Sequence, residues 1–214
     1  MIPLEILERL RYSLSEINSQ ILRNNYIKGL SELKFNLNAV RLFSEQQYYI
    51  ASNDAKAIAI MYSRSDYPDN TFFFKLLEGH QIALERLERL ITYFNIEKEK
   101  IYPLPSVVAY THFLLKLSLF HPIQEQIFAI LINFPIFIEN INKMGKILQE
   151  KYNFPEVSFF VDSKWEREIE FLALKILEKY DINFEKVFKT TKMIQEYELI
   201  YWESLYQEAI KTNP

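Results

Sequence analysis

The chain has 214 residues, of which 49% are hydrophobic and 15% aromatic, so it can build a sizeable core in one large domain or two small ones. Its three glycines lie far apart, which excludes Gly-rich phosphate loops, and the absence of cysteine excludes disulfides, thiolate metal sites and a Cys nucleophile. A net charge of −3 without a basic run or face argues against direct contact with nucleic acid.

Two features bear on where the chain resides. Its first residues lack the basic segment and continuous apolar core of a signal peptide. No uncharged apolar run reaches the roughly 20 residues that span a membrane, and the nearest, Ile127–Ile138, contains a proline. We therefore expect a cytoplasmic protein with no membrane partner.

Helical periodicity dominates the sequence, without convincing strand alternation or linker-like segments. The pattern predicts an all-α fold of about seven helices in a single domain over residues 1–214. The expected helices cover about residues 3–22, 38–63, 71–94, 106–120, 122–152, 163–180 and 183–211. Pro135 lies inside the fifth of these and predicts a kink there.

The last predicted helix carries an acid on its apolar face. The stripe of in-phase residues runs Phe184, Val187, Thr191, Ile194, Tyr201, Leu205 and Ala209. Glu198 fills the in-phase position between Ile194 and Tyr201. Burial would raise the pKa of its carboxyl and suit it to proton transfer near neutral pH. A glutamate at the edge of the stripe, reaching solvent, fits the same spacing.

The second and fourth predicted helices also place polar side chains on apolar faces. On the second helix either Gln46 or Gln47 shares the apolar face, as does either Asn53 or Asp54. A solvated helix edge explains any one of these residues equally simply. On the fourth helix Tyr110 aligns with the apolar stripe, either as a core residue with a satisfied hydroxyl or as a ligand contact.

The sequence predicts no metal site and no cofactor. The three histidines are His80, His112 and His121, and none pairs with another at the spacing of metal ligands on a helix. Paired Glu-x-x-His motifs of a di-iron site are missing. The lack of a histidine in the first 79 residues disfavours a haem site built on an early proximal histidine.

Three segments together resemble the TenA (thiaminase II) family over nearly the whole chain. Leu42–Ser65 resembles the family's second-helix signature, Pro105–Leu115 its Pro-x-x-x-x-Tyr-Thr segment, and Glu198–Trp202 its C-terminal Glu-x-x-Phe-Trp. The resemblance implies a haem-oxygenase-like helical bundle without haem, assembled as a homotetramer. It also implies hydrolysis at an aminopyrimidine, by cleavage of thiamin or by deamination of aminomethylpyrimidine in thiamin salvage.

Site residues carried over by this resemblance are few. Glu198 matches the family's proton-transferring acid, Tyr49 its second-helix tyrosine and Tyr110 its mid-chain tyrosine. Gln46 stands where the family has an Asp that holds the edge of the pyrimidine. An amide lacks the charge of that carboxylate but still accepts and donates hydrogen bonds.

Other family positions differ as well. Asn24 stands where a histidine is expected, and Phe160 stands where a tyrosine is expected. Tyr201, next to Glu198 on the stripe, completes the set of residues expected to bind the substrate.

The family's nucleophilic cysteine has no counterpart. Ile136 or Phe137 occupies its place, and neither can attack a substrate. Some branches of the family use a carboxylate instead, so Glu139, which lies nearby in the sequence, is a candidate substitute. That hypothesis requires Glu139 to face the pocket within reach of Glu198.

Four functions follow as alternatives. The first is a hydrolase or deaminase of an aminopyrimidine-like small molecule, with Glu198 as general acid and base. The second is a catalytically degenerate binding member. The third is transcriptional activation, which the acidic charge disfavours by direct DNA contact. The fourth is an oxygen-dependent enzyme on the same fold.

Overall fold

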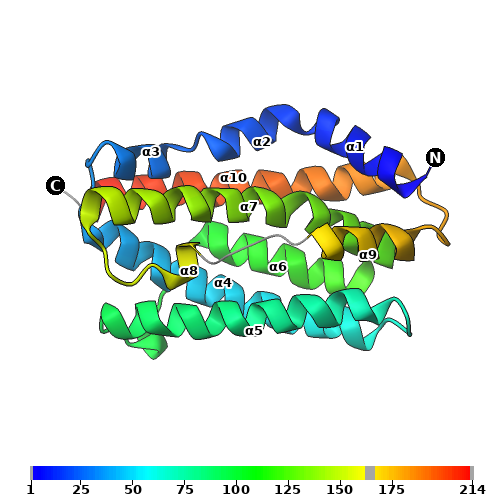
Figure 1. Ribbon diagram of the computed structural model, residues 1–214, viewed down its shortest axis with the longest axis horizontal. Coiled ribbons are helices and arrows are strands. Elements are labelled where there is room, and N and C mark those ends of the chain that lie inside the picture. Colours follow the sequence, from blue (N-terminus) through cyan, green and yellow to red (C-terminus); the bar gives the residue numbers. More distant parts are fainter. Residues whose placement is uncertain (1, 162–166, 213–214) are drawn as a thin grey trace.

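The computed structural model describes residues 2–161 and 167–212, which form helices and no strand (Figure 1). The prediction of an all-α fold is confirmed. The helices are α1 (Pro3–Ser13), α2 (Ser15–Leu22), α3 (Asn25–Ser31), α4 (Leu37–Ser63), α5 (Asn70–Tyr93), the 3-10 turn η1 (Lys98–Lys100), α6 (Pro105–Phe120), α7 (Ile123–Tyr152), α8 (Ser158–Val161), α9 (Arg167–Leu177) and α10 (Phe184–Thr212).

The predicted number of about seven helices is too low for local reasons. The backbone departs from helical geometry at Leu14, with φ −101° and ψ 7°, so the first predicted helix is two helices. Asn24 then caps α3, because its side-chain oxygen accepts a hydrogen bond from the backbone N–H of Ile27. The predicted start of the helix over 163–180 lies outside the described residues, and α9 ends at Leu177.

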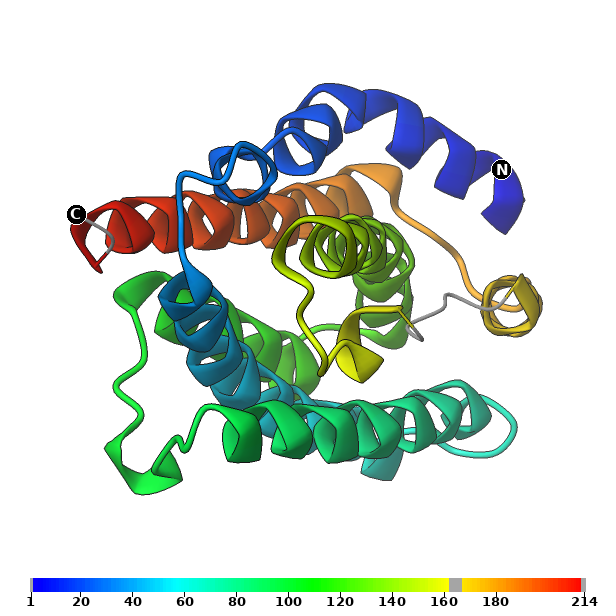
Figure 2. The same ribbon diagram turned by 60° about the vertical axis from the view of Figure 1, so that its left-hand side comes forward.

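Helix α10 is the central element of the bundle. It packs against α2, α3, α4, α6 and α7, while α5 packs along the outer side of α4. Figure 1 shows α1–α3 along one edge of the molecule and α5 along the opposite edge, and Figure 2 shows α5 facing α7 across the bundle. The long helices α4, α5, α6, α7 and α10 therefore surround the interior.

Except for Ile91 and Ile96, the buried hydrophobic side chains form one contiguous cluster that extends from α1 to α10. Such a cluster is what a single domain over residues 1–214 needs, although that boundary stays a prediction. Helix α7 is by length and composition long and apolar enough to cross a membrane, but 56% of its most apolar stretch is buried within the bundle. That burial is typical of a core helix.

Gly145 on α7 allows α8 to approach closely. A Cβ atom at this position would lie 2.8 Å from Cβ of Phe160 and 3.2 Å from its backbone carbon. Only a residue without a side chain fits such a contact. The contact holds α8 against α7, and it places Phe159 beside the space enclosed by the long helices.

Candidate functional site

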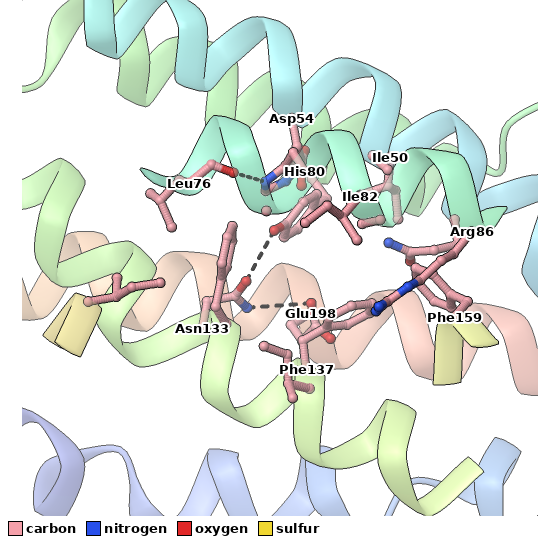
Figure 3. A pocket seen from close by; sticks show the side chains of 18 of the residues that line it. Ile50, Asp54, Leu76, His80, Ile82, Arg86, Asn133, Phe137, Phe159 and Glu198 are labelled. Carbon is pink, nitrogen blue, oxygen red and sulfur yellow. Dashed lines mark hydrogen bonds between the residues drawn. The ribbon is translucent and has the colours of Figure 1, made fainter. Parts of the chain in front are cut away.

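A cavity of about 350 Å³ lies between α4, α5, α6, α7 and α10, and α8 and α9 each add one apolar residue to its wall. Its wall is mostly apolar and aromatic, with a small set of polar side chains (Figure 3). The polar lining residues are Gln47, Asp54, Lys75, His80, Arg86, Tyr110, Asn133, Glu198 and Tyr201. Apolar walls with a few convergent polar groups are typical of small-molecule sites.

Glu198 lies on the buried stripe of α10 and faces this cavity. Its Oε1 accepts a hydrogen bond from Nε1 of Trp202 at 2.7 Å, and its Oε2 accepts a longer one from Asn133 at 3.4 Å. Burial raises the pKa of the carboxyl to about 7, although both hydrogen bonds act to lower it. Glu198 therefore exchanges its proton near neutral pH, as a general acid or base must.

Asp54 is the second carboxyl of the cavity and comes from α4. It is buried, and its Oδ1 has no hydrogen-bond partner in the described part of the chain. Burial raises the pKa of Asp54 well above its ordinary value, and the negative charge of Glu198 raises it further. Burial therefore favours the uncharged form of Asp54, which lines the cavity with one buried oxygen that has no partner in the described part of the chain.

A chain of amides, from buried Gln195 to half-buried Asn18, fixes the position of Asn133. Its Oδ1 accepts a hydrogen bond from the Tyr110 hydroxyl at 3.1 Å, and its Nδ2 donates to Oε1 of Gln195 at 2.9 Å. Nε2 of Gln195 in turn donates to Oδ1 of Asn18 at 2.6 Å. Asn133 thus presents a fixed donor to Glu198, because its other hydrogen bonds hold the amide in one orientation.

Tyr201 lies next to Glu198 along the same wall of the cavity. Its hydroxyl donates to Oε1 of Gln47 at 3.3 Å. Burial and the charge of Glu198 raise the pKa of Tyr201 well above its usual range, and burial does the same for the pKa of Tyr110. Both phenols therefore stay neutral and act as hydrogen-bonding groups.

His80 contributes a neutral imidazole to the α5 side of the cavity. Its Nδ1 lies 3.0 Å from the backbone oxygen of Leu76, so the Nδ1 atom carries the proton in this arrangement. Desolvation lowers the pKa of His80, although the hydrogen bond to Leu76 opposes this effect. Its ring lies 5.6 Å from that of Phe134, centroid to centroid.

Of the residues predicted for the site, the structure brings three to the cavity. Glu198, Tyr110 and Tyr201 all contribute to its wall. Gln46 does not. Its Oε1 accepts from the backbone N–H of Leu104 at 2.8 Å and its Nε2 donates to the oxygen of Tyr102 at 3.2 Å. Gln46 therefore fixes the segment that precedes α6, and α4 presents Gln47 and Asp54 to the cavity instead.

Three further predicted binding residues also lie away from the wall. Tyr49 is half-buried and packs against the core. Phe160 is buried, with its ring centroid 5.8 Å from that of Phe43. Phe159, and not Phe160, lines the cavity. Asn24 caps α3 and donates to the backbone oxygen of Ile21, so both ends of its amide serve the backbone.

Glu139 does not support the hypothesis of a substitute nucleophile. Its side chain is 51% exposed and its Oε1 lies 2.8 Å from Nζ of Lys143, one turn further along α7. The cavity wall from this part of α7 consists of Asn133, Phe134, Phe137 and Ile138. Glu139 follows directly after Ile138 but points to solvent, since adjacent positions of a helix are about 100° apart.

The residues that sequence reasoning left undecided or overlooked differ in how clearly the sequence marks them. Gln47 and Asp54 were each one of two candidates, because a helical stripe does not distinguish neighbouring positions. Asn133 had a clear signal, as a lone amide within the apolar run Ile127–Ile138. Within the described residues, no three His, Asp or Glu side chains gather to hold a metal ion.

The sequence of the chain matches the family model described as TENA/THI-4/PQQC over residues 12–208. No curated protein matches it. Similar solved structures include a TenA homologue from P. horikoshii OT3, with TM-score 0.78 and 18% identity over 94% of this chain and 98% of that one. A TenA homologue from Pyrococcus furiosus gives TM-score 0.77 and 17% identity over 94% and 99% of the chains.

The fold is also similar to that of haem oxygenase-1 from the cyanobacterium Synechocystis sp. PCC6803, solved in complex with haem. The TM-score is 0.73 at 15% identity, over 97% of this chain and 95% of that one. At such low identity the likeness shows a shared fold, and the expected haem-oxygenase-like bundle is confirmed.

Proposed function

Because the chain belongs to the TENA/THI-4/PQQC family, which its match over residues 12–208 shows, we propose that its cavity binds a small aminopyrimidine-like molecule and that Glu198 transfers protons to and from it. The observation that carries this proposal is the placement of two buried carboxyls, Asp54 and Glu198, in one aromatic-walled cavity. Perturbed acids in a cavity are typical of functional sites.

Asp54 suits the edge of an aminopyrimidine. A protonated carboxyl offers one O–H donor and one carbonyl acceptor side by side. The edge of an aminopyrimidine offers the reverse pattern, with an acceptor ring nitrogen beside a donor amino group. In its protonated form, which burial favours, Asp54 supplies a matched pair of hydrogen bonds to that edge and brings no charge into the cavity.

The aromatic lining suits a flat ring. Phe134, Phe137 and Phe159 come from α7 and α8, and Tyr110 and Tyr201 come from α6 and α10. Aromatic side chains bind planar ligands by offset stacking and edge contacts, which add to the burial of apolar area. A pyrimidine fits such a wall better than a saturated ring of the same size.

Glu198 suits hydrolysis by water, because the lining offers no Cys, Ser or Thr among the described residues. In the proposed deamination of an aminomethylpyrimidine, ionised Glu198 takes a proton from water as the water oxygen bonds to the methylene carbon. The C–N bond breaks, and Glu198 returns that proton to the leaving nitrogen, so hydroxymethylpyrimidine and ammonia form.

A direct test is to incubate the protein with aminomethylpyrimidine, formylaminopyrimidine and thiamin, and to measure products and binding. We expect release of ammonia from aminomethylpyrimidine, loss of at least about 10²-fold of that activity in Glu198→Gln, and little change in binding. The exposed Glu203→Gln on the same helix is the matched control. The proposal fails if none of the three compounds binds.

Binding without turnover is the second candidate function. The observation in its favour is that the described lining has no Cys, Ser or Thr nucleophile, although the pocket and its acids are present. Tight binding of one compound, weakened in Asp54→Asn, with no product from any of them would establish this candidate over the hydrolase.

A further inference from the structure

The geometry points to a ligand that carries an anionic substituent, a carboxylate or a phosphate, on its aminopyrimidine-like ring, with Arg86 of α5 as the group that binds the anion. This inference rests on the proposed function and specifies the class of molecule that the cavity accepts. It predicts that such ligands bind more tightly than pyrimidines without an anionic group and than thiamin, whose thiazolium ring is cationic.

Arg86 belongs to the wall of the cavity. It is half-buried on α5, and Figure 3 shows its side chain directed from α5 into the space near Phe159. Arg86 also has an interaction within the protein. A guanidinium has five N–H donors in a planar fork, so it binds a carboxylate or phosphate through two of them while it keeps other contacts.

The exposed residues of the cavity wall, Lys75, Gly79 and Ile82, all lie on α5. Gly79 is exposed yet lines the cavity, and a Cβ atom there would meet nothing within 4 Å. Ala83, one turn further on, is small as well, and Arg86 follows one turn after Ile82. Arg86 therefore borders the route between solvent and the cavity, where a substituent on a buried ring would project.

The charges of the lining favour an anion. Burial and the charge of Glu198 raise the pKa of Asp54 well above its ordinary value, which favours its uncharged form, and burial lowers the pKa of His80. The pKa of Glu198 is about 7, so its carboxyl is only partly ionised at neutral pH. The raised pKa values of both acids therefore reduce the negative charge of the lining that would repel an anion from the Arg86 guanidinium.

Lys75 is the other cation of the lining, but it is a poorer candidate. Its Nζ lies 3.8 Å from Oε2 of Glu78, and its side chain is 58% exposed. It lies about three turns from Arg86 on α5, too far to bind the same small group. Solvent also screens an exposed lysine more than a half-buried arginine. The proposal therefore commits to Arg86.

The experiment measures Kd by calorimetry for three matched probes: amino-hydroxymethylpyrimidine, its phosphate monoester and the corresponding pyrimidine carboxylate. We expect wild type to bind at least one anionic probe about tenfold or more tightly than the neutral alcohol. Arg86→Gln should abolish that preference and leave the Kd of the alcohol unchanged. Comparison of the Kd values of the phosphate monoester and the carboxylate shows which anion the site prefers.

Arg89→Gln is the matched control, because Arg89 lies on α5 but does not line the cavity. It should keep the preference of wild type. The proposal would be overturned if wild type bound the neutral alcohol as tightly as the anionic probes or more tightly. An equal loss of affinity for all three probes in Arg86→Gln would overturn it as well.

Benzoate and benzyl phosphate separate this inference from the proposed function. If these anions bind in an Arg86-dependent manner while no pyrimidine binds, the anion site stands and the aminopyrimidine site fails. If the pyrimidine alcohol binds while every anion is rejected, the aminopyrimidine site stands and the anion site fails.

Discussion

At the level of single residues, the site depends on two carboxyls whose pKa values are raised mainly by burial. Glu198 has two hydrogen-bond donors that support its ionised form, whereas Asp54 has an oxygen without a partner in the described part of the chain. Their environments therefore distinguish the two acids: Glu198 titrates near neutrality, whereas burial and the charge of Glu198 both favour the uncharged form of Asp54. Such a division is typical of acid and base pairs in enzymes.

The first prediction concerns the pH dependence of stability. The pKa of Glu198 is about 7 in the folded protein against an ordinary value of 4.5 for the unfolded chain, so between these values the folded state binds more protons than the unfolded state. Its free energy of unfolding therefore falls as pH rises from about 5 to 8, by on the order of 3 kcal/mol from this residue. Urea denaturation of wild type and Glu198→Gln measures this slope.

Glu198→Gln should flatten that slope, because glutamine does not titrate. The raised pKa of Asp54 and the lowered pKa of His80 both contribute to the slope that remains. A constant offset between the two proteins is compatible with this account. Identical slopes between about pH 5 and 8 would contradict it.

The second prediction concerns the amide chain behind Glu198. Gln195→Leu leaves Nδ2 of Asn133 and Oδ1 of Asn18 without their partner, which should cost about 1–3 kcal/mol of stability. It should also weaken ligand binding, since Asn133 is no longer held in one orientation. Gln207→Leu removes an exposed hydrogen bond to Glu203 on the same helix and should change neither quantity. Thermal unfolding measures the stability and calorimetry measures the binding. Unaltered binding in Gln195→Leu would show that the hydrogen-bonded amides do not position the site.

At the level of helices, two glycines have opposite roles. Gly79 faces open space on α5, whereas Gly145 on α7 contacts Phe160 of α8. We predict that Gly79→Ala stabilises the protein by about 0.5–1 kcal/mol, because alanine is the better helix former, and that Gly145→Ala destabilises it. Urea denaturation measures both changes. Destabilisation by Gly79→Ala would mean that this position is packed.

A bulkier residue at the same position tests the opening of the cavity. Gly79→Phe should slow ligand association measured by stopped flow, since the aromatic ring would occupy the space beside Ala83 and Arg86. An association rate equal to that of wild type would place the opening elsewhere.

The role of Asn24 gives a further prediction at this level. Asn24→Ala removes the N-cap of α3 and should cost about 1 kcal/mol of stability, with no effect on the Kd of any ligand. Asn25→Ala, at the next and exposed position, is the control and should change stability little. A higher Kd in Asn24→Ala, measured by calorimetry, would indicate that Asn24 contributes to the site.

The sequence predicted the long helices well and the short ones poorly. Proline and hydrophobic period mark the starts and lengths of α4, α5, α6, α7 and α10 to within about two residues. The break at Leu14 has no such mark, because leucine is a good helix former and no proline or glycine lies near it. Helix α8, with four residues, is too short to show a period.

At the level of the whole molecule, the order of helices around the cavity decides which polar residues form the site. Glu198 was predictable, since its nearest neighbours in phase on α10, Ile194 and Tyr201, are hydrophobic and buried. Gln46 and Asp54 were not, because α4 contacts α5, α6 and α10 on different faces, so its buried surface is wide. Which of its polar residues meets the cavity depends on those contacts and not on the period alone.

The central claim is that Asp54 and Glu198 together form a site for an aminopyrimidine-like ring, and a crystal structure of the protein soaked with aminomethylpyrimidine tests it most directly. The account predicts the ring between the aromatic side chains of the cavity, with its amino edge on Asp54 and its methylene carbon near Glu198. A ring bound elsewhere, or one in the cavity that contacts neither carboxyl, would contradict it.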